Sequence, residues 1–346
     1  MDGVALFRHL PRLQVPWVRL GVWPTPIRYA HDVWWKCEGE SHAVYGGNKI
    51  RTLEAWFGHA RDRGAELVWA IGAYGSNHAI ATVLHAPTAG LRAGAILFPQ
   101  PSSTWAIENC GALIETGCPI VRLRSVVEVP FVGLAFSRVR GVSVMPPGGA
   151  TPVGTFGAMS AAFELAEQIE AHEAPPPRRI VLAVGSTCTT AGLLAGLALA
   201  HALGVWRWPV PIIHAVRVTP WPVTSRLRIA ELARKTLARV ERLAGLRVAI
   251  SFSELLSRLV VDGRELGAGY GRSTIRGDRA QAELVDAPRL DGVYSAKAAV
   301  ALLRLQQGGV GPLLFWASKS TVELAAPSPA KLRVAPAAMA RWLATA

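Results

Sequence analysis

The sequence predicts an α/β protein with mostly parallel sheets and helices on both faces. Three observations predict this fold class. Short apolar runs rich in β-branched residues, typical of buried strands, recur along the chain. Longer runs rich in alanine and other small residues, typical of helices, lie between them. The 33 glycines and 24 prolines among 346 residues supply the many turns that such an alternation requires.

The alternation can be followed from residue 66 onward. ELVWAIG, GAILF, PIVRL and IVLAV read as continuous apolar strands, as expected where helices cover both faces of a sheet. The expected strands are 66–72, 94–98, 119–123, 180–184 and 211–218, and the expected helices are 77–90, the segment from 102 to about 116, 155–172 and 191–203. EAPPPRR at 173–179 is expected to be a surface connector, and the stretch from about Ala325 a short tail helix.

Composition limits the function classes. The formal net charge is +13, but the basic residues are scattered, so we expect a basic solvated surface and no nucleic-acid partner. The four cysteines, Cys37, Cys110, Cys118 and Cys188, form neither a CxxC motif nor a zinc spacing, and no metal site is predicted. The first 20 residues lack the apolar core of a signal peptide, so the expected location is the cytoplasm.

The segment 180–206 is nearly uncharged and long enough to cross a bilayer. It begins with the strand-like IVLAV, continues with the polar GSTCTT, and ends with the helical AGLLAGLALAHAL. A strand, a polar turn and a buried helix account for all three parts. The sequence therefore predicts no membrane partner.

The motif GGNKIRTLE at 46–54 places Lys49 where a loop enters a helix. The helix macrodipole disfavours positive charge there and would lower the pKa of the lysine. A lowered pKa helps an amine act as a nucleophile or form a Schiff base. Taken alone, the motif favours a lysine in solvent at the surface over a Schiff-base lysine.

Two further motifs follow strands and open helices. GAYGSNHA at 72–79 places Ser76 and Asn77 at the carboxyl end of a strand, where open α/β sheets bind ligands. Helix capping is the alternative role for these two residues. VGSTCTTAGLLAG at 184–196 lacks the Walker A and GxGxxG patterns, and is interpreted as a phosphate cradle or a plain turn.

The remaining motifs are loops ahead of helices. PPGGATPVGTFG at 146–157 is either an active-site loop or a connection. DGVYSAKA at 291–298 places Tyr294 and Ser295 at a turn, and Lys297 is expected in solvent.

Together these motifs carry a family resemblance. The order GGNK, SNH, GGxxPxG, a Ser/Thr loop with AGL, and VYSAKA resembles 1-aminocyclopropane-1-carboxylate deaminase and D-cysteine desulfhydrase. WPTPI at 23–27 is similar to the family's opening FPTPL, and GAGYGRST at 267–274 to its YGVP-type segment. The similarity runs from about residue 10 to 320.

The resemblance implies the tryptophan-synthase-β-like fold, fold type II of the enzymes that use pyridoxal 5′-phosphate (PLP). It implies a smaller domain at 56–164, a larger domain formed by 1–55 and 165–346, and PLP in the cleft between them. It also implies a small amino acid as substrate and a homo-oligomer.

The resemblance also assigns roles to residues. Lys49 would form a Schiff base with PLP and later move the substrate proton, while Asn77 would contact the cofactor ring. Ser76 would lie near the substrate carboxylate. The phosphate would be surrounded by Ser186, Thr187, Cys188, Thr189 and Thr190. Tyr270 and Tyr294 would line the substrate side, and Ser295 would face the pyridine nitrogen.

Within the family, His78 resembles the SNH of the desulfhydrases, and Ser295 stands where the deaminases place an acid. Both features favour D-cysteine desulfhydrase-like β-elimination over ring opening of 1-aminocyclopropane-1-carboxylate. The chain departs from the family at Thr187 and Cys188, where glycines are usual, and at ASKS (317–320), where HTGG is usual. Two alternatives therefore remain: a PLP-binding relative that has lost or changed the activity, and a PLP-free α/β nucleotide-binding or interaction module.

Overall fold

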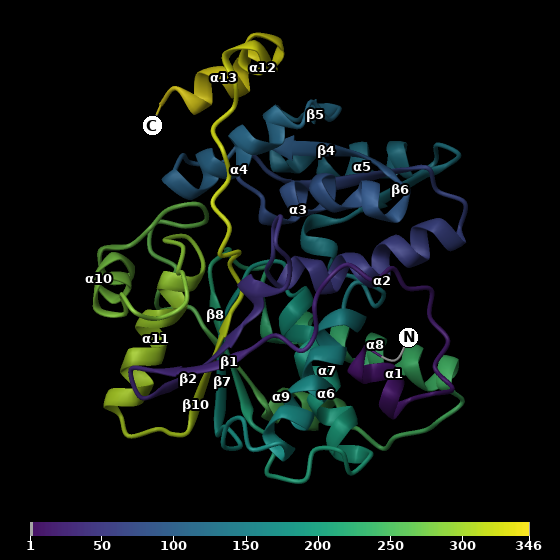
Figure 1. Cartoon of the computed structure of the whole chain (residues 1–346), viewed down its shortest axis with the longest axis vertical. Coiled ribbons are helices and arrows are strands. Elements are labelled where there is room, and N and C mark those ends of the chain that lie inside the picture. Colours follow the sequence, from purple (N-terminus) through teal and green to yellow (C-terminus); the bar gives the residue numbers. More distant parts are fainter. Residues whose placement is uncertain (1–2, 346) are drawn as a thin grey trace.

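The computed structural model describes residues 3–345, which fold around two sheets (Figure 1). The smaller sheet has the strand order β5-β4-β3-β6, and the larger has the order β1-β2-β10-β7-β8-β9. The strands are β1 Ile27–Ala30, β2 Val33–Cys37, β3 Leu67–Ala73, β4 Arg92–Phe98, β5 Ile120–Arg122, β6 Val142–Met145, β7 Arg179–Val184, β8 Ile212–Arg217, β9 Leu259–Asp262 and β10 Leu313–Ala317. All neighbouring strands run parallel except β1 and β2, which confirms the predicted α/β class.

Helices connect the strands and cover the sheets. They are α1 Ala5–His9, α2 Asn48–Asp62, α3 Asn77–His85, α4 Thr104–Glu115, α5 Val129–Ser137, α6 Phe156–Glu170, α7 Cys188–Ala202, α8 Arg226–Ala244, α9 Phe252–Ser257, α10 Ile275–Glu283, α11 Ser295–Gln307, α12 Pro329–Val334 and α13 Ala337–Leu343. Short 3₁₀ turns are η1 Glu38–Glu40, η2 Ala86–Ala89, η3 Val126–Glu128 and η4 Pro147–Gly149. The five strands and four helices expected between 66 and 218 are all present, with ends shifted by a few residues.

The apolar segment at 180–206 folds as strand β7, a polar turn and helix α7, as predicted. Small residues let α7 approach α6 closely. A Cβ added at Gly192 would lie 2.5 Å from the Thr155 carbonyl oxygen, and one at Gly196 would lie 2.6 Å from that of Met159. Within residues 3–345, no helix combines the length and the apolar character needed to cross a bilayer.

A buried cluster of charges fixes the first turns of α2. The guanidinium of Arg51 donates to Glu38 at 2.6 Å and to Glu164 of α6 at 2.8 Å, and Lys36 of β2 also donates to Glu164. These four side chains are at most 3% exposed. The cluster therefore ties α2 to the larger sheet and to α6.

The C-terminal tail is longer and more ordered than the single short helix expected. It leaves β10 in the larger sheet, crosses to the smaller sheet and ends in two helices, α12 and α13, beside α4 (Figure 1). The indole of Trp342 donates to the Gln100 carbonyl at 2.7 Å, and Ser328 N donates to Glu115 at 2.7 Å. The tail thus connects both sheets. The domain bounds at 56–164 stay a prediction.

Candidate functional site

Lys49 is the second residue of α2, two residues after the N-cap Gly47, whose φ of 104° favours glycine. The predicted loop-to-helix position is therefore confirmed. Its amine faces Gly148, where an added Cβ would lie 3.6 Å from Nζ. Burial lowers the pKa of Lys49, and the neighbouring Cys188 thiol opposes this in part. The interpretation of Lys49 as a lysine in solvent is therefore wrong.

The turn between β7 and α7 presents a helix N-terminus with unused donors. Thr187 has a left-handed φ of 76°, and its buried Oγ1 has no hydrogen-bond partner among residues 3–345. Thr189 Oγ1 accepts from the Asn48 amide at 2.8 Å. Cys188 Sγ instead points to the Gly149 carbonyl at 3.3 Å. The turn therefore suits an anion such as a phosphate, because N–H groups at a helix start and one free hydroxyl are available.

The predicted loop at 146–157 packs against this turn at Ser186. A Cβ on Gly148 would lie 2.0 Å from Ser186 Oγ, so only glycine fits there. The loop at 146–149 therefore packs beside Lys49 on the candidate phosphate-binding turn between β7 and α7.

His78 lies buried next to Lys49. Both its ring nitrogens lack a hydrogen-bond partner within the described part of the chain. Burial, helped by the charge of Lys49, lowers the pKa of His78 to about 3. The imidazole is therefore neutral near pH 7.

Asn77 is held by three donors. Its Oδ1 accepts from Tyr45 OH at 2.7 Å, from Asn109 Nδ2 at 2.9 Å and from Lys319 Nζ at 3.4 Å. With Oδ1 engaged in this way, the amide nitrogen of Asn77 is available as a donor to a ligand. Ser76 caps α3 by accepting from Ala79 N at 3.2 Å, which confirms the capping role for Ser76, whereas Asn77 is the first residue of the helix.

Tyr270 and Tyr294 meet in the site with their hydroxyl oxygens 2.6 Å apart. Burial raises the pKa of both phenols, so both stay protonated at neutral pH.

Lys297 is fully buried, and it donates to the carbonyls of Leu266 at 3.0 Å and Gly269 at 3.3 Å. The expectation that Lys297 lies in solvent is wrong, because its amine holds the loop that carries Tyr270.

Ser295 is the first residue of α11, and its hydroxyl is used within the turn. It donates to the Asp291 carboxylate at 2.9 Å and accepts from Asp291 N at 2.6 Å. A contact of Ser295 with a pyridine nitrogen therefore stays a prediction.

A pocket joins the predicted residues Asn77, Tyr270 and Tyr294. Its other lining residues were missed by the sequence analysis: Gly75, Gln100, Trp105, Ala106, Asn109, Asp291, Val293 and Lys319. Tyr294 lies between this pocket and the candidate phosphate-binding turn, since a Cβ added at Gly185 in that turn would lie 3.2 Å from the Tyr294 ring. One signal was available, because Lys319 follows an apolar strand, where α/β sheets place ligand contacts.

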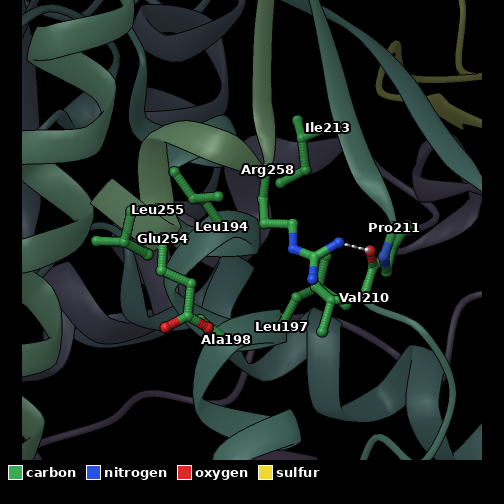
Figure 2. A pocket seen from close by; sticks show the side chains of 9 residues that line it. All are labelled: Leu194, Leu197, Ala198, Val210, Pro211, Ile213, Glu254, Leu255 and Arg258. Carbon is green, nitrogen blue, oxygen red and sulfur yellow. Dashed lines mark hydrogen bonds between the residues drawn. The ribbon is translucent and has the colours of Figure 1, made fainter. Parts of the chain in front are cut away.

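A second, mostly apolar pocket lies at the start of strand β8 in the larger sheet (Figure 2). Leu194 and Leu197 of α7 line it, and Arg258 donates to the Val210 carbonyl at 3.1 Å, just ahead of β8. Ligands of parallel sheets bind at the carboxyl ends of strands, whereas this pocket lies at the amino end of β8. The Lys49 region is therefore the candidate active site.

Comparison with known proteins identifies the family and the fold. A family model described as "Pyridoxal-phosphate dependent enzyme" matches residues 18–312. A solved structure described as an ACC (1-aminocyclopropane-1-carboxylate) deaminase homologue superposes with a TM-score of 0.73 at 26% identity, over 91% of this chain and 94% of that one. The predicted fold type is thereby confirmed.

Three proteins similar in sequence to this chain carry the names of three different activities. "Putative 1-aminocyclopropane-1-carboxylate deaminase" of Pyrococcus abyssi is 30% identical over 88% of this chain and 89% of that protein. D-cysteine desulfhydrase of Salmonella newport is 28% identical over 89% and 93%. Nocardicin C-9′ epimerase of Nocardia uniformis subsp. tsuyamanensis is 40% identical, but this match covers 47% of this chain and only about half, 52%, of that protein.

Proposed function

Because this chain belongs to the family of pyridoxal-phosphate dependent enzymes, we propose that it uses PLP at Lys49 to act on a small amino acid, by a D-cysteine desulfhydrase-like β-elimination. The observation that carries the proposal is the amine of Lys49, whose pKa burial lowers, beside Cys188 at the start of α7 and His78 of α3. Family membership also removes the alternative of a PLP-free module.

The described side chains fit the cofactor. We assign its phosphate to the start of α7, with Ser186 to Thr190 around it, because that turn offers helix N–H groups and the free hydroxyl of Thr187. Cys188 does not crowd this turn, since its thiol points to Gly149. The amide nitrogen of Asn77 would donate to the cofactor ring. When bound, PLP supplies an electron sink for a carbanion at the substrate's α-carbon.

The protein's own groups would move the protons. A lysine with a lowered pKa has a larger neutral fraction, so Lys49 can take the proton from the α-carbon. Tyr270 and Tyr294 stay protonated, and they would close the substrate side and offer a donor to the departing group. Ser76 and the start of α3 would face the substrate carboxylate.

Turnover by the purified protein tests the activity. We expect pyruvate and sulfide from D-cysteine, and no 2-oxobutanoate from 1-aminocyclopropane-1-carboxylate. Lys49→Ala is expected to abolish turnover, because both the attachment point and the base are removed. Lys235→Ala on the exposed side of α8 serves as the control. Unchanged turnover in Lys49→Ala would refute the assignment, and release of 2-oxobutanoate would select ring opening instead.

Epimerisation is the second candidate, and the 40% identity to nocardicin C-9′ epimerase over 172 residues favours it. Both reactions begin with proton removal from the α-carbon, but an epimerase returns the proton to the opposite face. Incubation in D₂O separates them. Deuterium at the α-carbon of recovered, inverted amino acid supports epimerisation, whereas keto acid and a released leaving group support elimination.

A further inference from the structure

Lys319 is a buried cation in the candidate substrate pocket. It lies two residues after β10, is 5% exposed and lines the pocket with Asn77 and Trp105. Its amine lies 5.6 Å from the ring centroid of Tyr45 and 5.4 Å from that of Trp105. Its hydrogen bond to Asn77 Oδ1 is long, at 3.4 Å. These contacts orient the ammonium without neutralising it.

Within residues 3–345, no carboxylate forms an ion pair with Lys319. Two carboxylates, Asp291 and Glu108, act on Lys319 through their charge, and both are hydrogen-bonded to other groups. Asp291 accepts from the backbone N–H of Tyr294 at 2.7 Å within the turn that starts α11. Glu108 accepts from Leu324 N at 2.9 Å and pairs with Arg289 at 3.6 Å. Burial lowers the pKa of Lys319, and the charges of Asp291 and Glu108 oppose this only in part. A buried ammonium that no carboxylate pairs directly is costly, so the pocket favours an anionic ligand.

Two other features of the pocket point to a ligand of the same kind. Gln100 Oε1 is buried there without a partner among residues 3–345. Asn77 begins α3, so the positive end of that helix also faces the pocket. A ligand that satisfies the pocket therefore carries an anionic oxygen group and a hydrogen-bond donor.

We propose that Lys319 binds a carboxylate of the substrate. This inference rests on the proposed function, because it takes the pocket at Tyr270 and Tyr294 as the substrate pocket. An amino acid offers two sources for the group: the α-carboxylate, or a carboxylate at the end of its side chain. The experiment distinguishes them with ligands that carry one, the other or neither.

The test titrates the PLP-loaded protein with D-alanine, 4-aminobutanoate and ethylamine and follows the cofactor's absorbance. D-alanine carries only the α-carboxylate, 4-aminobutanoate only a distal one, and ethylamine none. In Lys319→Met, we expect the Kd to rise at least tenfold for the ligand whose carboxylate Lys319 holds, and less than twofold for ethylamine. A loss with D-alanine assigns the α-carboxylate, and a loss with 4-aminobutanoate assigns the distal one. Equal changes for all three ligands, or none, would overturn the proposal and leave Lys319 only a positioning residue for Asn77.

Matched variants keep the test decisive. Lys319→Arg retains the charge and is expected to retain carboxylate selectivity, and Lys235→Met on exposed α8 is expected to change nothing. If Lys319→Met does not fold, Lys319→Gln gives the same comparison, since it keeps a donor to Asn77 without a charge. A wild-type protein that takes up no PLP contradicts the proposed function, whereas a loaded protein without carboxylate selectivity contradicts only the role of Lys319.

Discussion

At the scale of single residues, several side chains of the site are buried with polar atoms unpaired. His78 has two such ring nitrogens and Thr187 one hydroxyl. Buried polar groups normally find partners, and unpaired ones destabilise the protein. These atoms of His78 and Thr187 lie beside Lys49 and at the start of α7, where a bound cofactor would supply the missing partners.

His78 gives a pH dependence with a definite sign. In the unfolded chain its pKa returns to about 6.5, while burial lowers it to about 3 in the folded protein. As the pH falls, the imidazole of His78 is therefore protonated in the unfolded state at a higher pH than in the folded state. His78 contributes stability above pH 6.5 that is lost as the pH falls toward 3, by about 2 kcal/mol between pH 7.5 and 5.

Urea unfolding at pH 7.5 and pH 5 measures this effect. The free energy of unfolding is expected to fall less between these pH values in His78→Gln than in wild type, by about 2 kcal/mol. The exposed His172 provides the control, and His172→Asn is expected to leave the wild-type dependence unchanged. A dependence in His78→Gln identical to wild type would show that His78 titrates normally in the folded protein.

At the scale of elements, the start of α2 depends on the buried charges around Arg51. Glu164 accepts from Arg51, Lys36 and the backbone N–H of Thr25. Burial alone would raise the pKa of Glu164, but the charges of Arg51 and Lys36 outweigh it and lower the pKa to about 2. Lys49 lies two residues before Arg51 on the same helix. The cluster therefore positions the proposed attachment point of the cofactor.

Removing one charge of this cluster is expected to be severe. Glu164→Gln leaves Arg51 and Lys36 with too few carboxylates in a dry interior, and we expect a loss of about 3–5 kcal/mol in the free energy of unfolding. Glu231→Gln, which removes an exposed partner of Arg234, is the matched control and should change the free energy of unfolding far less. Denaturant unfolding of both variants measures the contrast. Equal losses in both would contradict a structural role for the buried cluster.

The elements between 66 and 218 could be predicted because each is a long, locally consistent apolar or small-residue run. The hairpin β1–β2 was not predicted, since it includes the charged Lys36, whose buried partner Glu164 lies 128 residues away. Lys319 was noted only as part of a departure from the family pattern. Its contact with Asn77 joins residues 242 apart, which no local pattern reveals.

At the scale of the whole molecule, the site is assembled from both halves of the chain. Lys49 and Asn77 lie near the N-terminus, the turn at 185–190 is central, and Tyr294 and Lys319 come late. The sequence predicted most of these positions only through the ordered set of motifs. The tail was predicted least well, because its contacts with α4 depend on side chains such as Trp342 rather than on periodicity.

The central claim is that Lys49 carries PLP, and one measurement tests it most directly. The purified protein is incubated with PLP, reduced with borohydride, digested and examined by mass spectrometry. We expect a yellow protein before reduction and a single pyridoxyl-modified peptide containing Lys49, with no modification at Lys297 or Lys319. A protein that stays colourless and unmodified, or one modified at another lysine, would contradict the account.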